Sequence, residues 1–233
     1  MNFSPLLRAD NLPLIKMCGL RRPGDVVAAR ESGADLIGMV FAPSRRRVSP
    51  TEAAAILAES GEHPPVVGVF VNLTAAEIEE TARIAGLALA QLSGEEPPAL
   101  AGSLSLPYIK TLHLKPDSTV EAVLRGMDRY PHAAAFLLDT WSSHGGGSGV
   151  AADWTLAAAI IKEAPGPVIL AGGLNPENVG EAIAVTGAAG VDVSSGIERD
   201  GWKDPARMAA FAGQARRNAA ITTNLGSVQR KAV

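Results

Sequence analysis

Residues 14–41 read LIKMCGLRRPGDVVAARESGADLIGMVF, and this stretch sets the pattern of the whole chain. A short apolar run, Leu14–Cys18, is followed by a longer segment rich in Ala and Arg and then by a second apolar run, Asp35–Phe41. Short apolar runs that alternate with longer mixed segments predict strands that alternate with helices. The turn Cys18-Gly19-Leu20-Arg21 lacks the G-x-G-x-x-G motif that an open, doubly wound sheet would usually carry after its first strand.

The alternation continues along the chain, and the last helix is predicted over Pro205–Arg217. Eight strand–helix units in 233 residues are typical of a compact (β/α)8 barrel, and the late position of the glycine-rich loops also favours the barrel over the open sheet. We therefore predict an α/β fold with a single (β/α)8 TIM barrel over residues 14–217, an N-terminal extension over residues 1–13 and a flexible C-terminal tail over residues 218–233. The predicted strands are Leu14–Cys18, Asp35–Phe41, Pro65–Val71, Leu87–Leu92, Tyr108–Leu114, Ala134–Thr140, Pro167–Ala171 and Val191–Ser194.

Composition excludes several classes of protein. The net charge of −3 argues against a nucleic-acid-binding surface, and the single cysteine cannot form an internal disulfide. No apolar run approaches the roughly 20 residues that a membrane span needs. The first 13 residues lack the charged segment and apolar core of a secretion signal. We therefore predict a cytoplasmic protein with a small-molecule substrate and neither a membrane nor a nucleic-acid partner.

Two residues suited to proton transfer end predicted strands. Cys18 closes the first strand, and Asp139 lies near the end of the sixth. In a (β/α)8 barrel the carboxyl ends of all strands meet at the face that carries the active site, so a thiol and a carboxylate there suit acid–base chemistry. The alternative stays open that Cys18 is a small buried hydrophobe and that Asp139 is a turn residue.

Lys16 and Asp192 are predicted to form an ion pair inside the barrel. Side chains alternate along a strand, so Lys16 shares the face of Cys18, and the first and eighth strands are neighbours in a closed barrel. A buried lysine needs a charged partner. The ammonium group is also expected to lower the pKa of the Cys18 thiol, as a thiol base requires. A purely structural role for the pair stays open beside this one.

Two loops late in the chain resemble phosphate-binding loops. Gly172 and Gly173 follow the seventh strand, and Ser194, Ser195 and Gly196 follow the eighth. Backbone N–H groups and hydroxyls bind phosphate without lysine, and the loops after strands seven and eight are the usual phosphate site of such barrels. Two ordinary turns remain the alternative.

Other polar residues give weaker signals. The basic triplet Arg45-Arg46-Arg47 follows the second strand, where one arginine is suited to gripping an anion. The glycine cluster at residues 145–149, which includes Gly147, is suited to a lid or to close approach of a ligand. No metal site is predicted, because the four histidines are scattered without ligand spacing: His63, His113, His132 and His144.

The order of several motifs makes the chain similar to one enzyme family. Together these motifs resemble the phosphoribosylanthranilate isomerases of tryptophan biosynthesis, over about residues 14–211. The motifs are KMCGL (16–20), GMVF (38–41), RRVSP (46–50), VGVFVN (67–72), LLDT (137–140), GGSG (146–149), AGGLNPENV (171–179) and VDVSSGIE (191–198).

The resemblance implies a (β/α)8 barrel that performs an Amadori rearrangement of N-(5-phosphoribosyl)anthranilate without a cofactor. It implies that Cys18 is the general base, Asp139 the general acid and Arg46 the arginine that contacts substrate, with Arg45 or Arg47 as alternatives. We assign Lys16, Gln91 and Asp192 to substrate binding as well, and Gly147 to the phosphate site with the two late loops. The resemblance leaves open whether the protein is a monomer or a homodimer.

One departure from the family pattern lies next to this site. Relatives often carry Gln-Leu-His-Gly after the fourth strand, whereas this chain has Gln91-Leu92-Ser93-Gly94. Two other functions remain open at this stage: another phosphate-binding barrel enzyme, and a barrel that binds a phosphorylated ligand without turning it over. A thiol paired with an acid favours the isomerase, because the related synthase is expected to use lysine and glutamate and the related histidine-pathway isomerase two aspartates.

Overall fold

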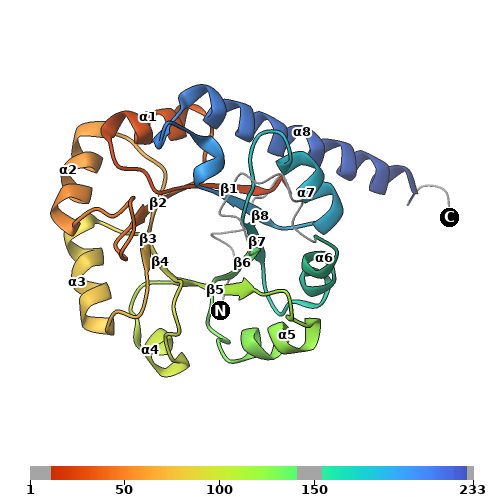
Figure 1. Ribbon diagram of the computed structural model, residues 1–233, viewed down its shortest axis with the longest axis horizontal. Coiled ribbons are helices and arrows are strands. Elements are labelled where there is room, and N and C mark those ends of the chain that lie inside the picture. Colours follow the sequence, from red (N-terminus) through yellow and green to blue (C-terminus); the bar gives the residue numbers. More distant parts are fainter. Residues whose placement is uncertain (1–11, 141–153, 230–233) are drawn as a thin grey trace.

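The fold is a closed barrel of eight parallel strands, each followed by a helix (Figure 1). The computed structural model describes residues 12–140 and 154–229, and side chains over residues 12–139 and 154–217. The strands are β1 (Leu14–Cys18), β2 (Leu36–Val40), β3 (Val66–Phe70), β4 (Leu89–Leu92), β5 (Tyr108–Leu114), β6 (Ala135–Thr140), β7 (Val168–Ala171) and β8 (Gly190–Val193). The helices are α1 (Pro23–Glu31), α2 (Pro50–Ser60), α3 (Ala75–Ala85), α4 (Pro98–Ser103), α5 (Val120–Asp128), α6 (Trp154–Glu163), α7 (Val179–Thr186) and α8 (Pro205–Gln229).

Local sequence signals explain where several helices begin. Ser49 and Thr74 each accept a hydrogen bond from the backbone N–H three residues later. The carboxylates of Glu52 and Glu77 in turn accept one from the backbone N–H of the capping residue. These reciprocal capping boxes satisfy N–H groups that the first turn of a helix leaves without partners. They begin α2 and α3 directly after the loops that leave β2 and β3.

Two apolar layers hold the barrel together. The larger layer lies between the strands and the surrounding helices. The smaller fills the barrel interior and is built mostly of branched or small side chains: Leu14, Leu36, Val67, Leu89, Ile109, Ala135, Leu137, Ile169 and Ala171. Because successive side chains along a strand point to opposite faces, these residues also identify which later residues of each strand face the interior.

The structure confirms the predicted barrel, and each predicted strand end lies within two residues of the observed one. The prediction of α8 was wrong at its C-terminal end, because the helix continues past Arg217 to Gln229 and extends beyond the barrel (Figure 1). Ala219 and Ala220 favour helix just past Arg217, and a helix already formed propagates readily without a regular apolar stripe. The division into an extension, a barrel domain and a tail stays a prediction.

The sequence also missed a short hairpin after β8. A single 3-10 turn, η1 (Ser195–Ile197), leads into β9 (Glu198–Arg199), which pairs antiparallel with β10 (Trp202–Lys203). Asp200 and Gly201 join the two strands with positive φ angles of 53° and 79°. Two-residue strands are too short to give a readable alternation. The hairpin matters for the site because it carries Glu198 and Lys203.

Candidate active site

Polar side chains gather at the carboxyl end of the barrel interior. Cys18 and Lys16 share the face of Leu14 on β1, and Asp139 shares the face of Leu137 on β6. The same alternation places further polar residues on this face: Gln91 on β4, Thr111 and His113 on β5, and Asp192 on β8. The carboxyl ends of barrel strands are where such enzymes carry their active sites.

Cys18 is buried and closely surrounded. It is 7% exposed, and a Cβ added to Gly38 on β2 would lie only 2.7 Å from the Cys18 Sγ. Glycine at position 38 therefore leaves the space that the thiol occupies. The Ser194 hydroxyl donates a hydrogen bond of 3.0 Å to the carbonyl oxygen of Cys18, which ties the end of β1 to the loop after β8.

The predicted ion pair between Lys16 and Asp192 is confirmed. Lys16 Nζ donates a hydrogen bond of 2.8 Å to Asp192 Oδ1, and the two residues are directly paired in the register of β1 and β8. The Lys16 side chain is fully buried and that of Asp192 is 11% exposed. Burial acts to lower the pKa of Lys16, but the charge of Asp192 and the contact with Cys18 outweigh it, so the pKa is raised. Lys16 therefore stays an ammonium group.

The expected lowering of the Cys18 pKa is wrong. Burial raises the pKa of this thiol, and the nearby Asp192 carboxylate adds to the effect. Lys16 and Lys203 oppose the shift but do not reverse it, since the positive charge of Lys16 is already paired with Asp192. In the absence of substrate, Cys18 is therefore a thiol at neutral pH.

Asp139 contacts a histidine that the sequence analysis did not assign to the site. His113 Nδ1 lies 3.3 Å from Asp139 Oδ2, and the two side chains are 45% and 42% exposed. The other ring nitrogen of His113, Nε2, lies 3.0 Å from the carbonyl oxygen of Ser93. One signal in the sequence pointed to this pair: the predicted strands Tyr108–Leu114 and Ala134–Thr140 have equal length, and aligning their first residues sets His113 opposite Asp139.

Gln91 has one amide atom available for a ligand. Its Nε2 donates a hydrogen bond of 3.0 Å to the Ser93 hydroxyl, which lies 3.1 Å from the hydroxyl of Thr111. Gln91 is 5% exposed, and within the described part of the chain no donor reaches its Oε1. Buried polar atoms in proteins nearly always have a partner, so this oxygen is a candidate acceptor for a substrate hydroxyl.

Glu198 joins three cations at the edge of the site. Its carboxylate accepts hydrogen bonds from Arg46 Nε and Nη2 at 2.6 and 3.0 Å, from Lys203 Nζ at 3.0 Å and from Arg45 Nη2 at 2.7 Å. Burial acts to raise the pKa of Glu198, but Arg46 and Lys203 together lower it to about 2. The carboxylate therefore stays charged and holds the arginines of the β2 loop against the hairpin after β8.

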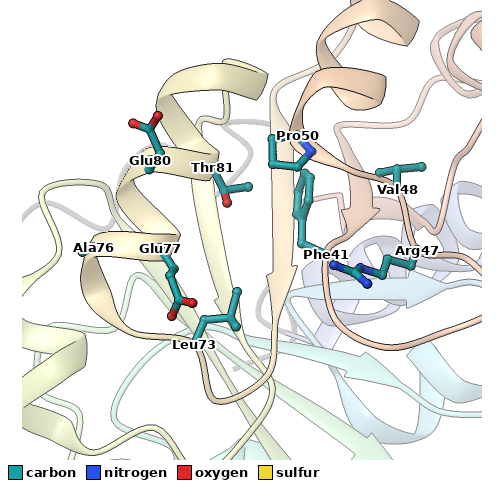
Figure 2. Close-up of a pocket in the computed structure, with 9 residues that line it drawn as sticks. All are labelled: Phe41, Arg47, Val48, Pro50, Leu73, Ala76, Glu77, Glu80 and Thr81. Carbon is teal, nitrogen blue, oxygen red and sulfur yellow. The ribbon is translucent and has the colours of Figure 1, made fainter.

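The three arginines of the basic triplet lie in different surroundings. The side chain of Arg46 is 18% exposed and passes close to Gly19, where an added Cβ would lie 2.5 Å from Arg46 Cδ. Arg45 is 60% exposed. Arg47 lines a groove of about 470 Å³ between α2 and α3, on the outer side of the barrel, together with Phe41 and Glu77 (Figure 2). Of the three, Arg46 is the one whose side chain packs against Gly19, directly after Cys18.

The two predicted phosphate loops lie in contact. A Cβ added to Gly196 would collide with the carbonyl oxygen of Leu174, so glycine is required there for the loops after β7 and β8 to approach. Gly172 and Gly173 have φ angles of 92° and 66°, which favour glycine. Lys203 Nζ donates a hydrogen bond of 2.9 Å to the carbonyl oxygen of Ser194, which adds positive charge to this end of the site. Gly147, also predicted to bind phosphate, lies outside the described residues.

The described residues show neither a metal-binding cluster nor a membrane-spanning helix. Over residues 12–139 and 154–217, no group of three or more His, Cys, Asp or Glu side chains is arranged to hold a metal ion. None of the helices described is both long enough and apolar enough to span a membrane.

Comparison with known proteins assigns the family. Residues 15–214 match the family model for N-(5'-phosphoribosyl)anthranilate (PRA) isomerase. The isomerase of that name from Stenotrophomonas maltophilia is 42% identical over 206 residues, which cover 87% of this chain and 93% of the relative. The crystal structure of the Thermotoga maritima isomerase superposes with a TM-score of 0.79 at 36% identity, covering 88% of this chain and all of that one. A structure described as that isomerase in complex with reduced 1-(o-carboxyphenylamino)-1-deoxyribulose 5-phosphate has a TM-score of 0.76 at 34% identity, with coverages of 88% and 100%. The chain therefore belongs to the N-(5'-phosphoribosyl)anthranilate isomerase family.

Proposed function

We propose that this chain converts N-(5-phosphoribosyl)anthranilate to 1-(o-carboxyphenylamino)-1-deoxyribulose 5-phosphate in tryptophan biosynthesis, with Asp139 as general acid and Cys18 as general base. The observation that carries the proposal is the position of these two groups, which face the barrel interior at the carboxyl ends of β1 and β6, with Cys18 in contact with Lys16 of the Lys16–Asp192 pair. A related isomerase binds the reduced form of the same product, which supports the assignment of the substrate.

Asp139 acts first in this reaction. Its carboxyl group donates a proton to the ribose ring oxygen, the bond between that oxygen and the first sugar carbon breaks, and the anthranilate nitrogen forms an iminium ion with that carbon. The Asp139 side chain is 42% exposed, so a ligand bound at the carboxyl end of the barrel can reach its carboxyl group. Acid catalysis of this kind typically contributes 10²- to 10⁴-fold to a rate.

Cys18 removes the next proton, from the second sugar carbon. The iminium ion makes that carbon acidic, and its positive charge also favours the thiolate in the buried pocket, so the Cys18 thiol first gives its own proton to solvent. The neutral enolamine that results tautomerises to the ketone, so the reaction needs no oxidant and no cofactor. Burial raises the pKa of the Cys18 thiol in the free protein. Cys18 therefore becomes a base only when the positively charged iminium ion forms beside it.

The remaining polar residues are assigned to binding. The loops that contain Gly172, Gly173, Ser194, Ser195 and Gly196 hold the phosphate through backbone N–H groups and hydroxyls. Gln91 Oε1 accepts a hydrogen bond from a sugar hydroxyl. Arg46, fixed by Glu198, provides the guanidinium group for the anthranilate carboxylate.

The test is fluorescence-monitored turnover of freshly made phosphoribosylanthranilate by the wild type, Cys18→Ala and Asp139→Asn. We expect both variants to keep their fold, seen in circular dichroism, and to lose at least about 10²-fold in kcat. A wild-type protein that binds a phosphorylated product analogue but shows no turnover would overturn the proposal and leave a binding function. Full activity in either variant would refute the role of that residue.

A further inference from the structure

His113 and Asp139 form a contact pair at the mouth of the barrel. The residues are directly opposite in the register of β5 and β6, both face the interior, and His113 Nδ1 lies 3.3 Å from Asp139 Oδ2. The second ring nitrogen, Nε2, lies 3.0 Å from the carbonyl oxygen of Ser93. The imidazole ring is therefore held from both sides, with one nitrogen on the backbone and the other on the proposed general acid.

The contact with Ser93 determines which nitrogen carries hydrogen. A carbonyl oxygen only accepts hydrogen bonds, so Nε2 of His113 must be the donor and carries a hydrogen in every charge state. When His113 is neutral, Nδ1 has only a lone pair, and the contact with Asp139 is a hydrogen bond only if the carboxyl group is protonated. When His113 is charged, Nδ1 donates to a carboxylate. In both forms the pair holds one proton between Nδ1 and Oδ2.

We propose that His113 is a positioning residue that supplies Asp139 with the proton for ring opening, an inference that rests on the function proposed above. Asp139 gives its proton to the ribose ring oxygen, and the carboxylate that remains takes the proton from His113 Nδ1. Neutral His113, which is 45% exposed, then regains a proton from water. Cys18 loses its own thiol proton to solvent when the iminium ion forms, and the proton that it then takes from the sugar restores the resting thiol, so the proton count balances.

The charges around His113 support this role. The hydrogen bond to Asp139 is the main cause that raises the pKa of His113; burial opposes it, and the hydrogen bond to Ser93 adds to the increase. Lys110, on the same strand, lowers the pKa slightly, but its ammonium group is tied to Glu96 by an ion pair of 2.8 Å. His113 can therefore keep a proton at a pH where an isolated aspartic acid, with a pKa of about 3.9, would have lost its own.

A purely structural role explains this pair less well. Both side chains are more than two-fifths exposed, and exposed ion pairs contribute little to stability because water and salt screen them. A contact that adds little stability but touches the proposed general acid is better explained by its effect on proton transfer. The two explanations differ in their dependence on pH.

The experiment compares kcat as a function of pH for the wild type, His113→Asn and His113→Gln. The asparagine amide can replace Nδ1 as a donor to Asp139, and the glutamine amide can replace Nε2 as a donor to Ser93, but neither group releases a proton. We expect kcat at pH 7.5 to fall about 10- to 10²-fold in both variants, with KM changed less than about twofold. The difference from the wild type should shrink as the pH falls, because protons from solvent then replace the one that His113 supplies.

Two measurements keep this inference separate from the proposed function. His132→Gln, in the loop before β6, is the matched control and should retain wild-type kcat. NMR of the histidine rings should show that the pKa of His113 falls in Asp139→Asn. Two outcomes with an active wild type would overturn the role of His113 alone. In the first, kcat of His113→Asn equals that of the wild type; in the second, kcat falls by the same factor at every pH from 5 to 9. An inactive wild type would overturn the proposed function and this role with it.

Discussion

Glu198 offers the sharpest test of the charge cluster beside the site. Its side chain is 6% exposed and accepts hydrogen bonds from Arg45, Arg46 and Lys203, while that of Lys203 is 2% exposed. Replacing Glu198 with Gln keeps the shape of the side chain and removes its charge. Lys203 and Arg46 then lose the partner that balances them, and buried charges without partners are costly.

The magnitude follows from the pKa of the carboxyl group. A pKa lowered from 4.5 to about 2 in the folded protein corresponds to roughly 3 kcal/mol of stability at pH 7, since each pKa unit is worth about 1.36 kcal/mol. Because the folded pKa is the lower one, this stability is fully present above pH 4.5 and is lost as the pH falls toward 2. At pH 3.5 we expect about 2 kcal/mol to remain.

The assay is urea denaturation of the wild type and Glu198→Gln at pH 7, 5, 4 and 3.5, followed by tryptophan fluorescence. The difference between the two free energies of unfolding cancels the acid sensitivity that both proteins share. Glu80→Gln is the control, since this carboxylate is 57% exposed and pairs only with Arg83 in the described part of the chain, so its effect should be much smaller. A difference that stays the same from pH 7 to pH 3.5 would refute the electrostatic argument and assign the effect to packing.

Three further predictions concern the residues around Cys18. Because burial raises the pKa of the thiol, Cys18 should react with iodoacetamide more slowly than free cysteine at pH 7, and the rate should still be rising above pH 9 when followed by mass spectrometry; a rate equal to that of free cysteine would contradict this. Lys16→Met should lower the free energy of unfolding by about 3–5 kcal/mol because it leaves Asp192 without its partner, and Asp192→Asn in the same chain should restore part of the loss in urea denaturation. Gly38→Ala should reduce kcat by about 10²-fold, because its Cβ would lie 2.7 Å from the Cys18 Sγ and displace the thiol; kinetics close to those of the wild type would show that the thiol can move without loss.

Predictions from the sequence succeeded where they depended on local patterns and on closure of the barrel. The strand count gave the fold, and alternation along β1 and β8 gave the Lys16–Asp192 pair, because in a closed barrel the first and last strands must be neighbours. The pKa of Cys18 was predicted wrongly for a physical reason. The sequence shows which charges are near the thiol, but the effect of burial depends on how completely the neighbouring strands cover it.

Contacts between distant loops, and contacts between side chains on neighbouring strands, were harder to predict. Glu198 lies 152 residues from Arg46 in the chain, and no pattern in either loop indicates that they meet. The spacing of the four histidines along the chain argues against a metal site, but it gives no information on whether His113 contacts Asp139. Its contact with Asp139 depends instead on the register of two neighbouring strands, which equal strand lengths suggest but do not require.

The surroundings of the two proposed proton-transfer groups also determine the order of the reaction. Cys18 is buried, and its thiolate is disfavoured until positive charge develops beside it, whereas Asp139 is partly exposed and in contact with a histidine that holds a proton. Ring opening creates that positive charge, because the iminium ion forms when the ring oxygen leaves. The acid step must therefore precede the base step, and a ligand whose ring cannot open should not lose the proton on its second sugar carbon to Cys18. Because Cys18 becomes a base only after Asp139 has opened the ring, the site does not remove protons from sugars whose ring is still closed.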